Sequence, residues 1–338
     1  MRFIKLLLLQ LVLTSSCVLA GSDEQQRKYD FDDYNAEVVE LLTEGSYVSG
    51  LNVDVHSTYQ YMDIYFDTKN QDLYNNGLSF RVRKRVYEDG DISWGVQLKS
   101  EMTESGETRM EVEIDSEEVE DYRVKFRGDD VALTYVLNEV FVAVSHKLEG
   151  GDKLGIDDQL SEIESWAEDE LDDAKRAPGR SPFETLLNLS NGEEFVFKSL
   201  KGFAPIIAGR SERIRSHIYV DLTDTTDELI NLAPSEKSAK KTPEYLQQEH
   251  LIWTMEASYD NSQFIPLRKG ETGDDGWCDD CGRRANIREY EVENKYSPSD
   301  SGTFILDIYE NAIVDMGAYS TLDSKYHQAA SAIYKRTQ

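Results

Sequence analysis

Cysteine, proline and histidine are scarce in this chain, whose 338 residues include three cysteines, seven prolines and five histidines. The histidines show no metal-ligand spacing and there is a single C-x-x-C pair, so the sequence lacks the paired ligand motifs of a zinc site. No internal repeat or coiled-coil heptad is present, which argues against a repeat array. After the first 20 residues no apolar run approaches 18 residues, so we expect no membrane-spanning helix.

Basic residues are also few, because Lys and Arg number 36 against 65 Asp and Glu, and the formal net charge is −29. A surface this acidic repels nucleic acid and anionic membranes, so we expect neither as a partner. Against this background a local cluster of cations is informative. One such cluster falls within a single short stretch: Arg81, Arg83, Lys84 and Arg85.

The first 20 residues have the pattern of a secretory signal peptide. A basic start, MRFIK, precedes the apolar run LLLLQLVL and the small-residue end Val18-Leu19-Ala20. We therefore predict that the protein is exported, to the periplasm or outside the cell, and that residues 21–338 form a single domain. Lipid attachment at Cys17 is an alternative that the sequence favours less, because the residues before it lack an apolar side chain three positions upstream.

The two remaining cysteines, Cys278 and Cys281, form the segment WCDDCG. In an exported protein such a pair is most simply a local disulfide. A zinc site would need two further ligands, and a redox role expects a strand-to-helix setting, whereas this pair lies in a polar loop. We predict the disulfide and keep zinc binding and redox activity as alternatives.

The rest of the sequence predicts an α+β fold that is mainly antiparallel sheet. Alternating apolar residues predict strands, and short links with turn residues favour an antiparallel meander among the first strands. The expected strands are 51–67, 78–86, 93–99, 108–114, 194–198, 211–220, 251–259 and 286–296. Helical periodicity indicates a short helix within 21–45, an acidic helical insertion at about 117–185, and two C-terminal helices at about 302–317 and 322–335.

Charged residues recur at alternate positions of these strands, so each row occupies one face of its strand. One explanation is an open sheet whose ionic face meets water. The other is a closed sheet with the ionic faces inside, where a bound polyanion and cations would be partners for charges that are costly to bury. The rows are Arg81, Arg83 and Arg85; Lys99; Arg109, Glu111 and Glu113; Arg213 and Arg215; Glu256; and Glu289, Glu291 and Glu293.

Several of these segments, in this order, resemble one known family. They are YFDTKNQDLYNNGLSFRVRKR, WGVQLK, the R-x-E-x-E that starts at Arg109, the R-x-R that starts at Arg213, the acidic strand of Glu256, the E-x-E that starts at Glu291, and the closing S-K-Y of residues 324–326. Together they resemble the CYTH superfamily, the triphosphate tunnel metalloenzymes. The resemblance covers residues 60 to 330 apart from the insertion.

The resemblance implies a closed or nearly closed antiparallel β-tunnel, with helices packed outside, that binds a triphosphate-containing small molecule together with Mg²⁺ or Mn²⁺. By position, the implied catalytic residues are Glu111, Glu113 and Lys99. The implied phosphate-binding residues are Arg81, Arg83, Lys99, Arg109, Arg213 and Arg215. The implied metal ligands are Glu111, Glu113, Glu256, Glu291 and Glu293.

The sequence departs from the family pattern at its beginning, where the family usually has an E-x-E-x-K strand. Nothing between residues 21 and 59 matches that motif, so either the first strand is degenerate or the tunnel lacks part of its metal site. Two functions follow as expectations. One is an exported, metal-dependent hydrolase of tripolyphosphate or of a nucleoside or organic triphosphate; the other is a non-catalytic polyphosphate-binding or anion-binding protein of the same fold. Cyclase activity is a third and less favoured option, because an exported protein meets little ATP.

Overall fold

The computed structural model describes residues 26–31, 39, 51–100, 110–151, 154–176, 181–192, 199–221, 251–267, 284–294, 306–307, 310–311 and 313–334. The signal segment 1–20, Cys278, Cys281, Arg109 and the expected strand at 194–198 lie outside these residues, and the predictions for them stay predictions. No helix in the described part of the chain is long and apolar enough to cross a membrane.

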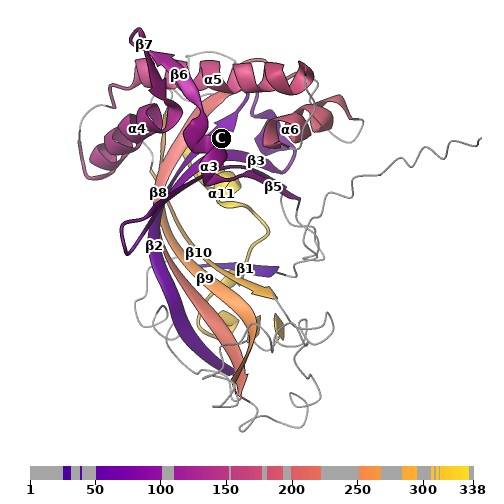
Figure 1. The fold of residues 1–338 in the computed structure, drawn as a ribbon. Coiled ribbons are helices and arrows are strands. Elements are labelled where there is room, and N and C mark those ends of the chain that lie inside the picture. Colours follow the sequence, from indigo (N-terminus) through magenta and orange to yellow (C-terminus); the bar gives the residue numbers. More distant parts are fainter. Residues whose placement is uncertain are drawn as a thin grey trace, which may run out of the picture.

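An antiparallel sheet of nine strands forms the body of the described structure (Figure 1). Its strand order is β11-β1-β10-β9-β8-β2-β3-β4-β5. The expected α+β class is confirmed, and β8 and β9 are longer than the sequence predicts. The strands are β1 (Gln26–Asp30), β2 (Leu51–Asp67), β3 (Leu78–Tyr87), β4 (Ile92–Ser100), β5 (Glu111–Ile114), β8 (Ala204–Asp221), β9 (Leu251–Pro266), β10 (Ala285–Asn294) and β11 (Tyr319–Ser320).

The longest strands, β2 and β8, lie at the centre of this sheet, with 17 and 18 residues. They pair along their length with two shifts of register, between Val55 and Ser57 and between Tyr65 and Phe66. Such irregularities bend a strand and increase its twist. The sheet curls, and the half containing β3, β4 and β5 stands over the half containing β9, β10 and β1 (Figure 1). We call the face inside this curl the concave face.

Asp67 builds the turn that joins β2 to β3. Its carboxylate accepts the three backbone N–H groups of residues 68, 73 and 74, at 2.6, 2.9 and 3.0 Å. These bonds fix the short helix α2 (Asp72–Asn75), and Gly77, at φ 65°, then leads into β3. The resulting register sets Asp63 of β2 directly opposite Arg83 of β3.

Helices cover the convex face of the β3–β5 half. Alternate residues of β3 and β4, such as Phe80 and Leu98, are fully buried in one core with helix residues such as Val140 and Ile163. The expected insertion is thus largely helical, although it also contains a hairpin of β6 and β7 that the sequence did not predict. Its elements are α3 (Ser116–Asp121), β6 (Arg123–Phe126), β7 (Asp129–Ala132), α4 (Leu133–Leu148), α5 (Asp157–Arg176) and α6 (Pro182–Asn191).

The last helix, α11 (Lys325–Tyr334), lies inside the curl rather than outside it. Its residues Ala329 and Ile333 are buried against Ile207, Phe264 and Ile287, which share the concave face with the ionic rows. The expectation that all helices pack outside is therefore wrong for α11. The physical reason is that this end of the concave face is apolar and needs a cover.

Two further expectations change. The sequence predicted no strand near the N-terminus, but β1 pairs antiparallel with β10 there and carries Gln26, Lys28 and Asp30 at alternate positions, which do not form the E-x-E-x-K that the resemblance implies. In addition, the sheet of described residues is open, because β5 and β11 are its two edges and no pairing joins them there. The prediction of a closed tunnel is not confirmed.

Candidate functional site: an ionic cavity on the concave face

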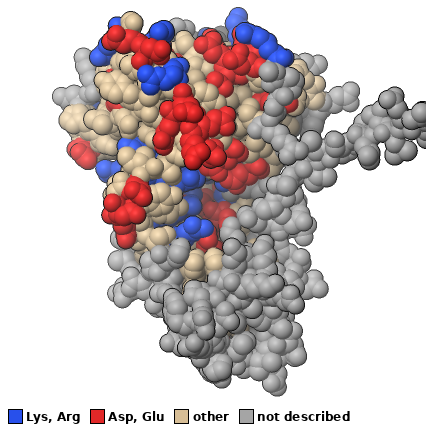
Figure 2. Space-filling model, viewed as in Figure 1, with Lys and Arg blue, Asp and Glu red and all other residues tan. Residues whose placement is uncertain are grey.

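The concave face carries the ionic rows, and strand pairing aligns them across the sheet. Arg81, Gln97 and Glu113 are successive neighbours on β3, β4 and β5. In the other half, Arg213 of β8 is opposite Asp260 of β9. A cavity of about 850 Å³ lies between the halves and is lined by residues from both. Figure 2 shows basic side chains in this hollow with acidic side chains around it.

Arg81 and Arg83 enter the cavity beside a fully buried acid, Asp63. Arg83 donates from Nε and Nη2 to the two Asp63 oxygens at 2.6 and 2.7 Å, and Arg81 Nη1 lies 3.6 Å from Oδ2. Burial alone would raise the pKa of Asp63, but the charges of Arg83 and Arg81 hold this pKa at about 2. Arg81 also donates from Nε to Gln97 Oε1 at 2.8 Å. Asp63 is thus ionised at neutral pH and orients both guanidinium groups.

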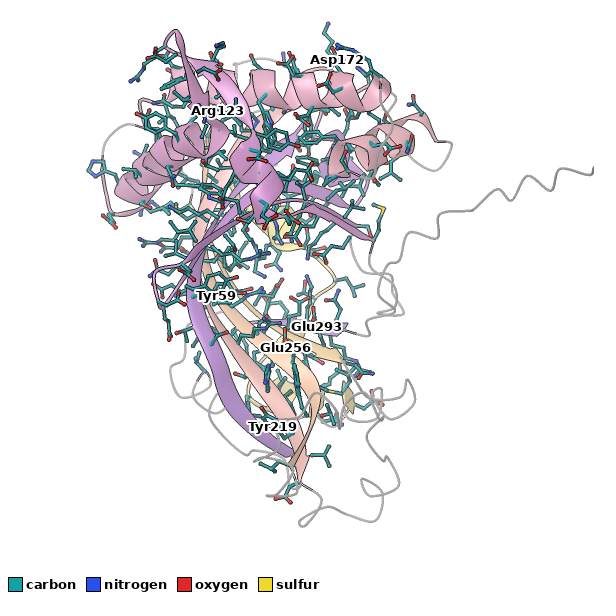
Figure 3. All side chains as sticks on the ribbon, in the orientation of Figure 1. Tyr59, Arg123, Asp172, Tyr219, Glu256 and Glu293 are labelled. Carbon is teal, nitrogen blue, oxygen red and sulfur yellow. The ribbon has the colours of Figure 1, made fainter. Side chains whose placement is uncertain are left out.

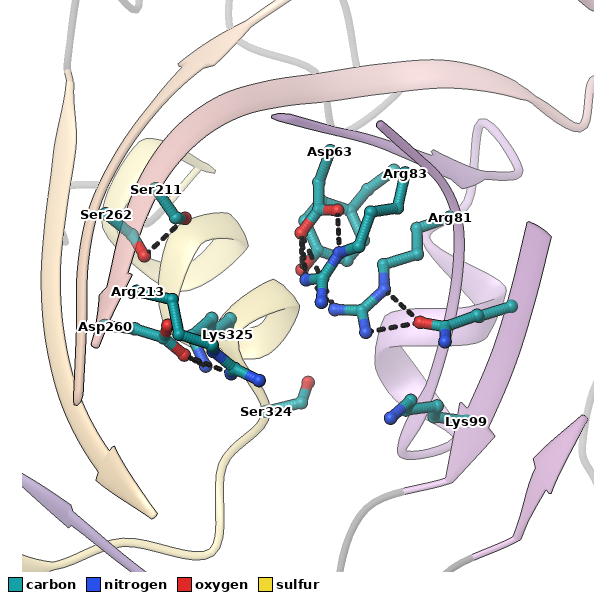
Figure 4. Close-up of polar contacts among 12 residues, drawn as sticks. Asp63, Arg81, Arg83, Lys99, Ser211, Arg213, Asp260, Ser262, Ser324 and Lys325 are labelled. Atoms are coloured by element: carbon teal, nitrogen blue, oxygen red, sulfur yellow. Dashed lines mark hydrogen bonds and ion pairs between the residues drawn. The ribbon is translucent and has the colours of Figure 1, made fainter. Parts of the chain in front are cut away.

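Arg213 has a matching partner in the other half. Its Nε donates to Asp260 Oδ1 at 2.6 Å, and its Nη2 bonds to Oδ2. Lys325, at the start of α11, places Nζ 2.6 Å from Asp260 Oδ2 and also bonds to Glu289. Burial opposes ionisation of Asp260, yet the Arg213 and Lys325 charges lower its pKa below the usual range. Figure 4 shows this group across the cavity from Arg81.

Tyr61 connects the two buried arginine pairs. Its ring centroid lies 3.8 Å from Arg83 Cζ and 5.5 Å from Arg213 Cζ. Both distances are within the range of a cation–π interaction. Because the Tyr61 ring is fully buried, the two pairs and the ring together form a rigid base for the cavity.

Three other cations that line the cavity each contact a carboxylate of β5 or β9. Their side chains are more exposed than that of Arg83, which is 4% exposed. Contacts of this kind contribute less stability than a buried bidentate pair, because water competes with them. A phosphate group can therefore replace the carboxylate at moderate cost. The pairs are Lys99 with Glu111 at 2.6 Å (14% and 38% exposed), Arg85 with Glu113 at 3.4 Å (21% and 35%), and Arg215 with Glu256 at 2.5 Å (38% and 11%).

The acidic wall is the side of the cavity formed by Glu256 of β9 and by Glu289, Glu291 and Glu293 of β10. Figure 3 shows Glu256 near Glu293, its direct neighbour in the register. Strand β1 borders this wall and sets its own polar residues against it. The opposed pairs are Gln26 with Glu293, Lys28 with Glu291, and Asp30 with Glu289.

The predicted metal ligands do not converge. In the parts of the chain that the structure describes, no group of three or more His, Cys, Asp or Glu side chains could hold a metal ion. Glu111 and Glu113 are on β5, whereas the other three are on β9 and β10. Glu111, Glu113 and Glu256 contact a Lys or Arg nitrogen, and Glu291 and Glu293 contact the Gln26 amide nitrogen in the amide orientation that satisfies its hydrogen bonds. Carboxylates that bind Mg²⁺ must direct their oxygens at one ion about 2.0–2.1 Å away. The described residues therefore do not fit a resident divalent cation.

The cavity brings together most of the residues that the sequence points to. The implied phosphate-binding side chains that line it are Arg81, Arg83, Lys99, Arg213 and Arg215. Among these, Arg83 and Arg213 are held in bidentate pairs by buried aspartates, so their main effect is structural. Arg109 lies outside the described residues.

Four charged lining residues did not appear among the sequence-predicted site residues: Lys28, Arg85, Glu289 and Lys325. Arg85 and Glu289 belong to rows that alternation had already identified, so the sequence placed them on the ionic face without giving them a role. Lys325 occurs in the closing S-K-Y, which marked it without giving a role. Lys28 had no signal, because its strand lacks the apolar alternation by which strands are found.

Comparisons with known proteins give distant matches only. No family model matches the sequence, and no curated protein does. Among solved structures, the chain is similar to PH1819 from Pyrococcus horikoshii OT3, with 13% identity over 90% of this chain and 96% of the other and a TM-score of 0.37. It is also similar to HpAC1 from Hippeastrum, proposed as an adenylyl cyclase and described as having a dominant triphosphatase activity, with 11% identity over 90% and 93% and a TM-score of 0.32. TM-scores below 0.5 are too low to support a function, which must come from the cavity.

Proposed function

We propose that the protein binds a triphosphate-containing compound in the cavity and hydrolyses one of its phosphoanhydride bonds. The proposed substrate is inorganic tripolyphosphate or a nucleoside or organic triphosphate. The observation that carries the proposal is the placement of basic side chains on opposite sides of one cavity, with Arg81 and Lys99 on one side and Arg215 and Lys325 on the other. Arginine matches the geometry of phosphate oxygens, and a chain of phosphates presents charge along its whole length. The sequence resemblance to the triphosphate tunnel enzymes points the same way.

The proposed reaction needs a water molecule and a group that accepts its proton. The water oxygen attacks the terminal phosphorus, the bond from that phosphorus to the bridging oxygen breaks, and the electron pair leaves with the bridging oxygen. We assign the proton acceptor to Glu111, whose carboxylate is held by Lys99 at 2.6 Å. Glu113, two residues along the same strand face, orients the water, and the basic side chains offset the charge of the phosphates.

Magnesium and manganese remain predictions of the sequence resemblance. Since the described carboxylates do not fit a resident ion, an ion that enters bound to the triphosphate is part of the substrate here. Release of phosphate should therefore be measured with either ion and with EDTA.

A phosphate-release assay on tripolyphosphate and ATP tests the proposal. The wild type should release phosphate, and Glu111→Gln should lower turnover by at least about tenfold while retaining binding, as expected for a proton acceptor. Arg123→Ala is a matched control, because Arg123 is exposed and pairs with Asp130 across the β6–β7 hairpin, whose residues do not line the cavity. Turnover that is absent in the folded wild type with every ion tested would contradict the enzymatic proposal.

A second candidate is binding without hydrolysis. It is favoured by the ion pairs that engage both implied catalytic carboxylates, Glu111 with Lys99 and Glu113 with Arg85. A carboxylate engaged by an ammonium or guanidinium group is a weaker proton acceptor than an unengaged one. Calorimetric binding of tripolyphosphate with no phosphate released would favour this candidate.

Export is a further part of the proposal, supported by the signal-peptide pattern of residues 1–20. Purification from the native host followed by N-terminal sequencing should give a chain that starts at Gly21. A chain that starts at Cys17 and carries lipid would favour the membrane-anchored alternative, and an intact Met1 would contradict export.

A further inference from the structure

Strand β1 carries a lysine into the acidic wall. Lys28 is 3% exposed and faces the cavity, directly opposite Glu291 of β10. A buried lysine is costly unless a negative charge compensates it. The position of Lys28 therefore indicates which ions the acidic wall can accommodate.

Two ammonium groups flank Glu289. Lys28 Nζ lies 3.7 Å from its Oε2, and Lys325 Nζ hydrogen-bonds to its Oε1. Glu289 is fully buried, and the two ammonium groups compensate its negative charge. Lys325 is held in turn by Asp260, at 2.6 Å.

The other carboxylates of the wall also contact nitrogen. In the orientation that satisfies its hydrogen bonds, the Gln26 amide donates to Glu293 Oε1 at 3.3 Å and to Glu291 Oε1. Arg215 Nη2 lies 2.5 Å from Glu256 Oε2. Each carboxylate of the acidic wall thus has at least one oxygen against a nitrogen of this same chain. Glu289 Oε2, which makes no hydrogen bond among the described residues, lies 3.7 Å from the Lys28 ammonium group.

We propose that Lys28 and Gln26 take the place of a divalent cation in the acidic wall, so that the cavity binds its polyphosphate ligand without a resident metal ion. This inference rests on the proposed function for the identity of the ligand. A divalent ion at the wall would be repelled by the Lys28 and Lys325 ammonium groups, which lie close to the oxygens that it would need. Lys28 instead supplies a cation that reaches phosphate oxygens from the acidic side of the cavity.

Crystals of the full chain soaked in Mn²⁺, which substitutes for Mg²⁺, test the metal part directly. An anomalous difference map should show no manganese between β1 and β10 in the wild type. Manganese bound there would overturn the inference. The double variant Gln26→Glu/Lys28→Glu, which converts these two positions to carboxylates, should gain manganese at this place. A folded double variant that binds none would also count against it.

Calorimetric titration of tripolyphosphate tests the ligand part. The wild type should bind tripolyphosphate equally well, within about twofold, in Mg²⁺ and in EDTA. Lys28→Gln should weaken this binding by at least about tenfold, which is the loss expected for one charge-assisted contact. Lys175→Gln is the matched control, because Lys175 is exposed on α5 and pairs with Asp172. Binding that disappears in EDTA would overturn the inference while leaving the proposed function intact.

The two failures can be told apart. Absence of tripolyphosphate binding in every buffer would contradict the proposed function, and the manganese map on the wild type would still decide whether the wall takes a metal. That map requires no substitution, so the decision does not depend on whether the Lys28→Gln protein folds.

Discussion

Asp63 and Asp260 are the residues that hold the arginines of the cavity in place. Each accepts two hydrogen bonds from one guanidinium group, and Tyr61 lies between the two arginines. The sequence identified the arginines from their alternation. It could not identify their partners, because Asp63 meets Arg83 only through the register that the Asp67 turn imposes.

Arg83→Ala should destabilise the protein by about 3–5 kcal/mol, because it leaves Asp63 as a buried charge without its bidentate partner. Urea unfolding followed by circular dichroism measures this loss. Arg123→Ala, which removes an exposed arginine, should change the free energy of unfolding by less than about 1 kcal/mol. Equal effects of the two substitutions would show that Arg83 is not structural.

Asp30 should make stability depend on pH. Burial, together with the Glu289 charge, raises the pKa of Asp30 from 3.8 to about 7. A carboxyl group with a raised folded-state pKa binds its proton more tightly when folded, so its contribution is present below pH 4 and is lost as the pH rises to 7. Melting temperatures of the wild type minus those of Asp30→Asn should therefore fall between pH 4 and 7. A difference that rises over this interval would contradict the assigned direction.

At the scale of elements, the sequence predicted α11 and most strands but missed β1 and the side on which α11 packs. Helical periodicity shows that a helix has an apolar face, but it does not show which surface that face meets. The surface that α11 covers includes Ile207, Phe264 and Ile287, which are on strands far from α11 in the sequence. Strand β1 was missed because QRKYD contains few β-formers, and its pairing with β10 compensates for this.

Two glycines on the row of the Asp63–Arg83 pair predict opposite responses to the same substitution. A Cβ on Gly209 of β8 would lie 2.1 Å from the Phe264 ring and 2.6 Å from the Gln263 carbonyl oxygen, neither of which can move freely beneath α11. Gly209→Ala should therefore cost about 1–3 kcal/mol or more by overpacking. A Cβ on Gly95 of β4 would press against the end of the Glu113 side chain, at 2.7 Å, and make an ordinary contact with the Ile114 carbonyl oxygen, at 3.7 Å. Gly95→Ala should be tolerated, and a Gly209→Ala protein as stable as the wild type would contradict this packing.

For the molecule as a whole, the alternation of charged residues indicated one ionic face but left open whether the sheet closes around it. Closure depends on whether the edge strands meet, and period-two patterning carries no information about that. In the described residues the sheet is curled, with β5 and β11 as its edges. The curl alone brings the ionic rows of the two halves to one cavity.

The acidity of the whole molecule also affects how a polyanion reaches the cavity. A chain of net charge −29 repels phosphate at long range, and this repulsion is screened by salt. Association of tripolyphosphate, followed by stopped-flow calorimetry or fluorescence, should therefore be faster at about 150 mM than at about 10 mM salt. Association that slows steeply as salt is added would show that the cavity field, rather than the net charge, controls the approach.

In the proposed complex, one phosphate chain contacts both halves of the cavity. Calorimetric titration of tripolyphosphate into the wild type, Lys99→Ala and Arg215→Ala measures this bridging, because Lys99 is on β4, Arg215 is on β8, and both line the cavity. We predict one ligand per chain and a weakening of at least about tenfold in each variant. No binding to the folded wild type, or unchanged affinity in both variants, would show that no phosphate chain bridges the two halves.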